Sequence, residues 1–156
     1  MIGAQPVTVR DARPENAEAI GRLSRTLAAH VADPDPGRDA AGIVAACFGP
    51  DRWIEVILAE RRGEIVGLAA WCRRFELHTR ERSLWLADLV VAETARREGV
   101  GHLLVQSIHQ RAQAMGCGTI VADLWVDNAS ARAFYDRIGA RANTEIEIRV
   151  IDLPMR

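Results

Sequence analysis

Apolar residues recur every three or four positions in the first part of the chain, which predicts an amphipathic helix. Pro14 suits the first turn of that helix, because its missing N–H would have no partner there. The run Asp33-Pro-Asp-Pro-Gly37 cannot continue a helix and therefore ends it. A second, shorter helix is predicted over Asp39–Cys47, and a short strand over Val7–Arg10 precedes both. The repeating apolar positions of the first helix are Ala19, Ile20, Leu23, Leu27 and Val31.

After residue 50 the apolar period changes to one that is typical of strands. Trp53–Glu60 and Ile65–Arg73 are rich in strand-forming residues, and the turn Arg61-Arg-Gly-Glu64 between them predicts a hairpin. Ser83–Val91 is almost wholly apolar, as expected of a strand that is covered on both faces.

A long helix is predicted to begin at Gly99, and Gly116-Cys-Gly118 ends it. Thr119–Val126 is predicted to be another strand, and either Asp127 or Asn128 caps the helix that follows. The apolar stripe of the long helix consists of Val100, Leu103, Leu104, Ile108, Ala112 and Met115.

The last helix is predicted to stop at Gly139, and one more strand follows it. Glu145–Val150 alternates strictly between charged and apolar residues, which predicts a strand with one face in water. The element order is therefore β–α–α–β–β–β–α–β–α–β. It predicts an α+β fold with a mixed sheet, in a single domain over residues 1–156. The inner face of the last helix carries Ala131, Phe134, Tyr135 and Ile138.

Composition narrows the class of protein. The 156 residues are 49% hydrophobic and 26% charged, with a net charge of −1, so no overall field attracts nucleic acid or an anionic membrane. Cys47, Cys72 and Cys117 are widely spaced, which favours reduced thiols over a disulfide frame or a zinc site. The sequence shows neither a signal peptide nor a bilayer-spanning run, so we expect a soluble, cytoplasmic protein without a bound metal.

The segment from Ala87 to Leu104 combines the features of a phosphate-binding loop. An apolar strand leads to Arg96 and Arg97, then to Gly99-Val-Gly101, and then to a helix whose first N–H groups have no intrahelical partner. Arginines add charge-assisted hydrogen bonds to phosphate, and glycines let the backbone approach it. No Lys-Ser/Thr pair follows Gly101, so the segment is not a P-loop. A dinucleotide-binding fingerprint would need a third glycine where Leu104 stands.

Two motifs in this chain resemble those of one family. Arg96-x-x-Gly99-x-Gly101 resembles the coenzyme-A pyrophosphate loop of the Gcn5-related N-acetyltransferases (GNAT). Asn128-Ala-Ser-Ala-Arg-Ala-Phe-Tyr-Asp-Arg-Ile-Gly139 is similar to the family's Asn-x-x-Ala-x-x-Phe-Tyr-x-x-x-Gly motif. The resemblance extends over residues 7–151 and implies the acyl-CoA N-acyltransferase fold, a mixed, mostly antiparallel sheet flanked by helices. The block from Trp85 to Gly99 is most similar to the small-amine branch, which includes aminoglycoside and polyamine acetyltransferases.

The resemblance implies where acetyl-CoA would bind. The cofactor would lie in a gap between the strands over 84–91 and 119–126, with its amides bonded to main-chain groups that the gap leaves unpaired. Asn128 would hold it from the other side, and the pyrophosphate would sit on the turn and the start of the helix. The main-chain contacts expected along the strand are Leu89, Val90 and Val91. Those expected around the pyrophosphate are Arg96, Arg97, Glu98, Gly99, Val100, Gly101 and His102.

Tyr135 and Asp88 are the candidate catalytic residues. Tyr135 matches the family's general acid, which gives a proton to the departing thiolate. The reference pKa values of a phenol, about 10, and of a thiol, about 8.5, allow this transfer. Tyr135 also fits the buried stripe of its helix. Asp88 is the acidic residue of an otherwise apolar strand, where an unpaired carboxylate is costly. It could bind the substrate ammonium, accept its proton, or form a structural salt bridge with an arginine.

The acceptor is less defined by sequence. Asp33, His78 and Trp85 are the further candidates for contact with it, although a plain loop or packing role fits each of them too. Ala87 stands where polyamine enzymes of this resemblance often have Glu, which argues against a polyamine. We therefore expect direct acetyl transfer from acetyl-CoA to a small cationic primary amine, in a homodimer that could use Glu145–Ile151 as its interface edge. The alternatives are a protein N-terminal or lysine acetyltransferase and a non-catalytic acyl-CoA sensor.

Overall fold

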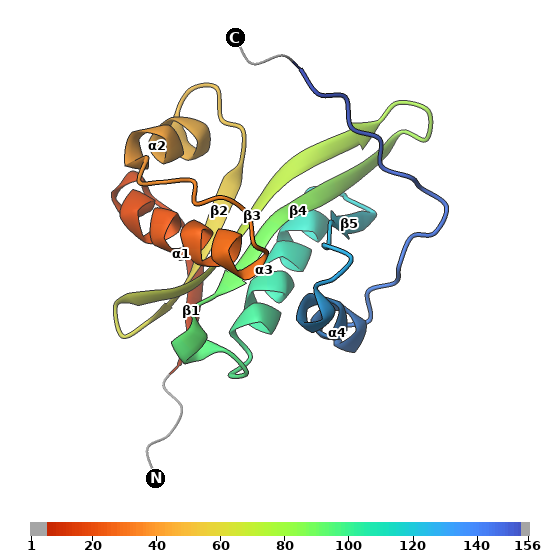
Figure 1. Ribbon diagram of the computed structural model, residues 1–156. Helices are drawn as coiled ribbons and strands as arrows, with labels where there is room; N and C mark the ends of the chain where they lie inside the picture. Colours follow the sequence, from red (N-terminus) through yellow and green to blue (C-terminus); the bar gives the residue numbers. More distant parts are fainter. Residues whose placement is uncertain (1–5, 154–156) are drawn as a thin grey trace. The chain divides into compact units, whose positions relative to one another are not determined.

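The computed structural model describes residues 6–153, which divide into two compact units. The first ends at Trp125 and the second begins at Val126 (Figure 1). The prediction of one domain over residues 1–156 stays a prediction, and its ends, residues 1–5 and 154–156, lie outside the described residues.

A five-stranded sheet forms the frame of the first unit, with strand order β1-β2-β3-β4-β5. The pairs β1–β2, β2–β3 and β3–β4 are antiparallel, and β4–β5 is parallel. The sheet is thus mixed and mostly antiparallel, which confirms the predicted fold class. The strands are β1 Thr8–Asp11, β2 Glu55–Arg61, β3 Glu64–Glu76, β4 Glu81–Val91 and β5 Thr119–Ala122.

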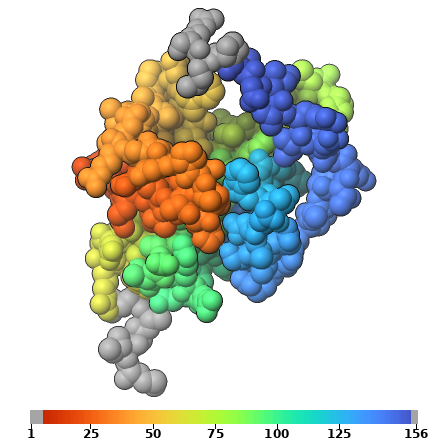
Figure 2. Space-filling view, viewed as in Figure 1, coloured from red at the N-terminus to blue at the C-terminus, as the bar shows by residue number. Residues whose placement is uncertain are grey.

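The helices α1 (Ala17–His30) and α2 (Ala40–Phe48) pack on one face of this sheet. A short 3-10 turn, η1 (Pro14–Asn16), precedes α1, as the proline predicted. Asp39 caps α2, since its Oδ1 accepts the Gly42 N–H at 2.8 Å. Figure 2 shows α1, α2 and the segment between them as one continuous red-to-orange surface. The buried core beneath them is Ile20, Leu23, Cys47, Val56, Leu58, Ile65, Leu68, Ala70 and Val90.

The long helix α3 (Val100–Ala114) packs on the opposite face. A Cβ on Gly67 would lie 3.2 Å from Val100 and 3.3 Å from Leu104, so a glycine lets α3 approach β3 closely. Because successive strand residues point to opposite faces, Gly67 faces α3 while Leu68 faces α1 and α2. None of the helices in the described part of the chain is long and apolar enough to cross a membrane.

Two strand ends differ from prediction by three or four residues, and two tryptophans lie outside the strands expected to hold them. β3 continues to Glu76 instead of ending at Arg73, because the hairpin ladder with β4 extends to the pair Glu76–Glu81. β5 ends at Ala122 instead of Val126, where its pairing with β4 stops. Trp53, expected in a strand, precedes β2 and is exposed, and Trp125, also expected in a strand, follows β5 and is exposed.

The second unit contains α4 (Ala129–Arg137), and of the two candidate caps Asn128 is the one used. Its Oδ1 accepts the Ala131 N–H at 3.0 Å, and Gly139 follows the helix with φ +82°. The strand predicted over Glu145–Val150 is wrong: these residues form no strand and are exposed. Alternation shows which side chains would share a face, but a strand also needs a neighbour for its main-chain groups.

Candidate functional site

The strands β4 and β5 separate partway along β4. Their pairing runs from Ser83–Thr119 to Leu86–Ala122, and β4 then continues to Val91 without a second neighbour in the described residues on that side. Main-chain N–H and C=O groups along residues 87–91 that do not bond to β3 therefore face a gap. A linear ligand with amide groups can complete that edge as an added strand would.

A β-bulge lies at the point where the strands separate. Ala70 pairs with Asp88 and Trp71 with Leu86, so Ala87 is an extra residue on β4. A bulge bends its strand and redirects the neighbouring side chains. Here it comes directly after the last β4–β5 pair and directly before Asp88. Nothing in the sequence predicted it.

The turn before α3 has the backbone of an anion-binding loop. Arg97 and Gly99 have φ of +64° and +83°, and no side chain in residues 6–153 caps the helix. Leu103 N–H bonds to Gly99 C=O at 3.0 Å. The N–H groups of residues 100–102 precede this bond and lie at the helix N-terminus, where anions are favoured. Gly101 and His102 lie in this first turn.

The two arginines of the loop, expected to act alike, have different surroundings. Arg96 Nε donates to the Val91 carbonyl at 3.1 Å, which ties the loop to the end of β4. Arg97 is exposed and forms no side-chain hydrogen bond or ion pair within the described region. Glu98 forms an ion pair with Arg61 at the end of β2. Arg97 is therefore the loop arginine with its charge free, while Arg96 and Glu98 brace the loop.

Asp88 lies on the face of the sheet that α1 and α2 cover, opposite Ala70. It is half-buried, and this burial raises the pKa of its carboxyl group. Across residues 6–153 its side chain has no hydrogen bond or ion pair with another residue, so the structural salt bridge considered from sequence does not form in the described part. A half-buried carboxylate without a partner is costly. Such a group is suited to meet a cation from outside.

Trp85 lies on the same face of the sheet as Asp88, nearer to the β3–β4 turn. It pairs with Cys72, and the Arg74 guanidinium lies 5.7 Å from its ring centroid. Arg74 also donates to Glu76 at 2.7 Å. The ring is half-buried, and along the ladder the Cys72–Trp85 pair lies between the Ala70–Asp88 pair and the Arg74–Ser83 pair.

The other two acceptor candidates lie in exposed segments. His78 is in the β3–β4 turn, with Nε2 3.8 Å from Glu76. Glu81 and Asp88 are seven positions apart along β4, roughly 23 Å at strand spacing, so the turn is far from the carboxylate. Asp33 lies in the loop between α1 and α2.

Tyr135 and Asn128 belong to the second unit. Tyr135 is half-buried on α4 and contacts Phe134 edge-to-face, with ring centroids 5.3 Å apart. Burial raises the pKa of Tyr135 to about 12, so the phenol keeps its proton at neutral pH. The Asn128 Oδ1 accepts hydrogen bonds from Ala131 N–H and the Ser130 hydroxyl, both at 3.0 Å. Its amide nitrogen remains as the available donor.

Residues 25–140 match the acetyltransferase (GNAT) family, a match that covers more than half of the chain. The chain belongs to the GNAT family. Its resemblance to curated proteins includes a probable N-acetyltransferase 14 from Danio rerio, 34% identical over 91 residues. That alignment covers 58% of this GNAT chain and 31% of the relative, so the chain spans about a third of the relative's length.

Solved structures share the GNAT fold over nearly the whole chain. A ribosomal-protein-alanine N-acetyltransferase from Brucella melitensis has a TM-score of 0.77 at 19% identity, covering 96% of this chain and 100% of that one. An aminoglycoside acetyltransferase from an uncultured soil metagenomic sample, in complex with sisomicin, has a TM-score of 0.78 at 15% identity. The alignment covers 95% of this chain and 97% of that one. At these identities the likeness concerns the fold alone.

Three features of this GNAT chain were missed by reasoning from sequence. They are the bulge at Ala87, the pairing of Arg61 with Glu98, and the bond that occupies Arg96. The first is a shift in strand register, and the second joins residues 37 positions apart. The third depends on how the turn folds back onto the end of β4, which the residue pattern does not show. Within the described residues, no cluster of three His, Cys, Asp or Glu side chains could hold a metal ion.

Proposed function

We propose that this protein transfers the acetyl group of acetyl-CoA to a primary amine, a small cationic one, by direct transfer in a ternary complex. The observation that carries the proposal is the unpartnered, half-buried carboxylate of Asp88, one residue beyond the bulge where β4 leaves β5. The free edge of β4 and a candidate cation site thus lie side by side at the bulge.

The donor side of the proposal rests on the fit between the backbone and the chemistry of coenzyme A. Pantetheine is a linear diamide, and the β4 edge at Leu89, Val90 and Val91 offers main-chain donors and acceptors to such a chain. The diphosphate would be held by residues 96–102, with Arg97 supplying the free charge. Asn128 is proposed as a further contact through its amide. Bound there, acetyl-CoA supplies the thioester.

On the acceptor side, Asp88 would bind the ammonium group and take its proton, directly or through water. The raised pKa of Asp88 brings its carboxylate closer to the range of an effective base. Trp85 would form a wall for the amine, and Asp33 would lie at the outer rim of the acceptor site. The turn that carries His78 is too far from Asp88 for His78 to contact a small amine bound there. Placing the neutral amine beside the thioester contributes much of the rate enhancement, because a reaction between two separate molecules becomes a reaction within one complex.

Tyr135 is proposed as the general acid. Its pKa of about 12 keeps the Oη hydrogen in place across the physiological range, so the proton-donor form is present when the thiolate departs. The same burial makes the phenol a weaker acid than a free tyrosine. In the proposed mechanism no cysteine carries the acetyl group.

The test is thiol release from acetyl-CoA against aminoglycosides, polyamines, amino acids and short peptides, with coenzyme-A binding measured by calorimetry. We expect turnover with one class of cationic amine and a loss of at least about tenfold in kcat/KM for Asp88→Asn, because a charge-assisted contact is removed. Asp51→Asn changes an exposed carboxylate in the turn before β2 and is the matched control. Turnover with peptides alone would favour a protein acetyltransferase. Binding of coenzyme A without thiol release would favour a non-catalytic sensor and overturn the proposal.

The proposal also covers the oligomeric state of the protein and its place in the cell. We propose further that the protein is a cytoplasmic homodimer that works without a metal, nucleic-acid or membrane partner. Glu145–Ile151 form no strand, so the interface edge expected there is absent from the described structure. Sedimentation equilibrium over a tenfold range of concentration would test the dimer, and a monomer throughout that range would remove it.

A further inference from the structure

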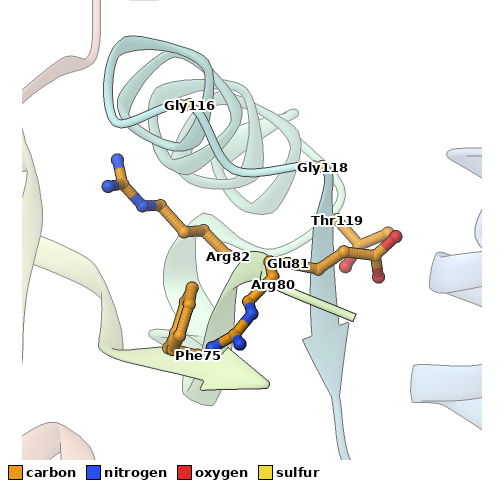
Figure 3. A pocket seen from close by; sticks show the side chains of 7 residues that line it. All are labelled: Phe75, Arg80, Glu81, Arg82, Gly116, Gly118 and Thr119. Atoms are coloured by element: carbon orange, nitrogen blue, oxygen red, sulfur yellow. The ribbon is translucent and has the colours of Figure 1, made fainter. Parts of the chain in front are cut away.

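A hollow lies at the start of β4, between the tip of the β3–β4 hairpin and the turn that joins α3 to β5 (Figure 3). Its volume is about 630 Å³. Arg82 and Asp88 are six residues apart on β4, roughly 20 Å at strand spacing, so this hollow is separate from the proposed acceptor site. It is lined by Phe75, Arg80, Glu81, Arg82, Gly116, Gly118 and Thr119.

Hydrogen bonds between the two segments hold the hollow in shape. Gly118 N–H donates to the Arg82 carbonyl at 2.9 Å, and Arg82 Nη1 donates to the Met115 carbonyl at 3.3 Å. In Figure 3 the Arg82 side chain extends toward the turn at Gly116. Gly116 has φ +69°, and a Cβ on Gly118 would meet no atom within 4 Å. One side of the hollow is therefore bare backbone.

The arginines of the hollow lack the carboxylate partners that others on the hairpin have. Arg73 pairs with Glu55 at 3.4 Å, and Arg74 with Glu76 at 2.7 Å. Arg80 forms no side-chain hydrogen bond or ion pair in the region the structure describes, and Arg82 uses one N–H on a carbonyl.

The lining therefore has positive charge to spare. Glu81 is its acidic member, and it pairs with neither arginine, so two guanidinium groups stand against one carboxylate. Guanidinium groups bind carboxylate and phosphate through paired N–H donors.

An aromatic wall adds a second recognition element. Phe75 lies opposite Arg82 in the strand register and is 52% exposed. A large apolar ring with half of its surface in water gains by covering it with a flat group. The combination of guanidinium groups with an exposed ring matches a ligand with an anion attached to a ring.

We propose that this hollow binds a small molecule in which a carboxylate or phosphate group is attached to a flat ring. Arg80, whose side chain has no partner in the described region and lies beside Phe75 in Figure 3, binds the anion, and Phe75 stacks on the ring. Arg82 adds positive charge from the side of the Gly116 turn. The site is independent of acetyl transfer, and the proposal does not rest on the proposed function.

The experiment is a titration of the full chain, without coenzyme A, followed by amide NMR shifts. Phenyl phosphate, benzoate, inorganic phosphate and benzyl alcohol are the probes. We expect phenyl phosphate or benzoate to shift the amides of Arg80, Arg82, Gly118 and Thr119 in a saturable way, and the tighter binder identifies the anion. Benzyl alcohol should bind at least about tenfold more weakly, because it lacks the charge.

Variants make the test specific. Arg80→Gln should weaken binding at least about tenfold, whereas Arg73→Gln, on the same hairpin but outside the hollow, should leave the Kd within about twofold. Arg80 forms no side-chain bond in the described region, so its replacement leaves the fold intact and the result interpretable. Equal binding by Arg80→Gln and Arg73→Gln, or no saturable shift with either ring-bearing anion, would overturn the proposal. Equal affinity for inorganic phosphate and phenyl phosphate would overturn the role of Phe75.

Discussion

Leu86 of β4 and Ala122 of β5 form the last pair that joins these two parallel strands. Beyond it, β4 runs on to Val91 with β3 as its neighbour on one side. Unpaired main-chain amides exchange with solvent faster than amides in a ladder. We expect some amides in residues 87–91 to exchange faster than those of 83–86 and to become protected when coenzyme A is added. Hydrogen exchange with and without coenzyme A measures this, and unchanged exchange over 87–91 would argue against binding along that edge.

Gly99 and Gly63 allow a matched test of the loop. Both have positive φ, +83° and +77°, and a Cβ at either would meet no atom within 4 Å. Valine at either position strains the backbone by roughly 1–2 kcal/mol. We expect Gly99→Val and Gly63→Val to lower the free energy of unfolding by similar amounts, and Gly99→Val alone to weaken coenzyme-A binding, by about tenfold or more. Urea unfolding and calorimetry give the two readouts. Equal coenzyme-A affinity in both variants would show that this loop does not bind the diphosphate.

Replacing Arg96 and replacing Arg97 should have different effects on coenzyme-A binding and on stability in the same assays. Arg97→Gln removes an exposed, unpaired charge, so we expect weaker coenzyme-A binding, a smaller dependence of the Kd on salt, and little change in stability. Arg96→Gln breaks the bond to the Val91 carbonyl and should lower stability by about 1 kcal/mol. A larger loss of salt dependence in Arg96→Gln than in Arg97→Gln would reverse these roles.

Asp88→Asn should make the protein more stable at neutral pH. Burial raises the pKa of Asp88, so the folded state binds this proton more tightly than the unfolded chain does. The carboxylate therefore costs stability once the pH is above its folded-state pKa. The advantage of the variant should shrink as the pH falls through that pKa and vanish below the unfolded value of about 3.9. Urea unfolding at several pH values tests this, and an advantage that grows toward acid would contradict it.

Tyr135→Phe should lower kcat by about a hundredfold and leave the Kd for coenzyme A within about threefold, because a proton donor is lost and the ring is kept. With a pKa of about 12, Tyr135 stays protonated from pH 6 to pH 10, so the ratio of the two rates should be constant there. Phe134→Leu removes the edge-to-face contact and controls for packing. Equal kcat for Tyr135→Phe and the native protein would exclude Tyr135 as the acid.

Much of the fold could be predicted because its signals are local. The apolar run of β4 and the stripe on α3 come from burial on a strand and on a helix, and both elements are present. The error over Glu145–Val150 has a physical cause, since alternation describes side chains and a strand depends on a partner.

The sequence predicted which residues belong to the candidate site better than it predicted which groups surround them. Asp88 could be singled out because a carboxylate in an apolar strand is unusual. The sequence could not show that Arg96 is hydrogen-bonded to the Val91 carbonyl while Arg97 is exposed. This difference depends on where the end of β4 lies relative to the turn.

The loop before α3 is anchored on both sides. Ala95 is completely buried and Val100 is 1% exposed, while the ion pair between Glu98 and Arg61 holds the middle of the turn. A loop that had to fold around its ligand would add a slow step to association. In this protein the N–H groups are already in position, so the rate at which an anion is captured there is governed by diffusion and salt concentration instead of by a change in shape.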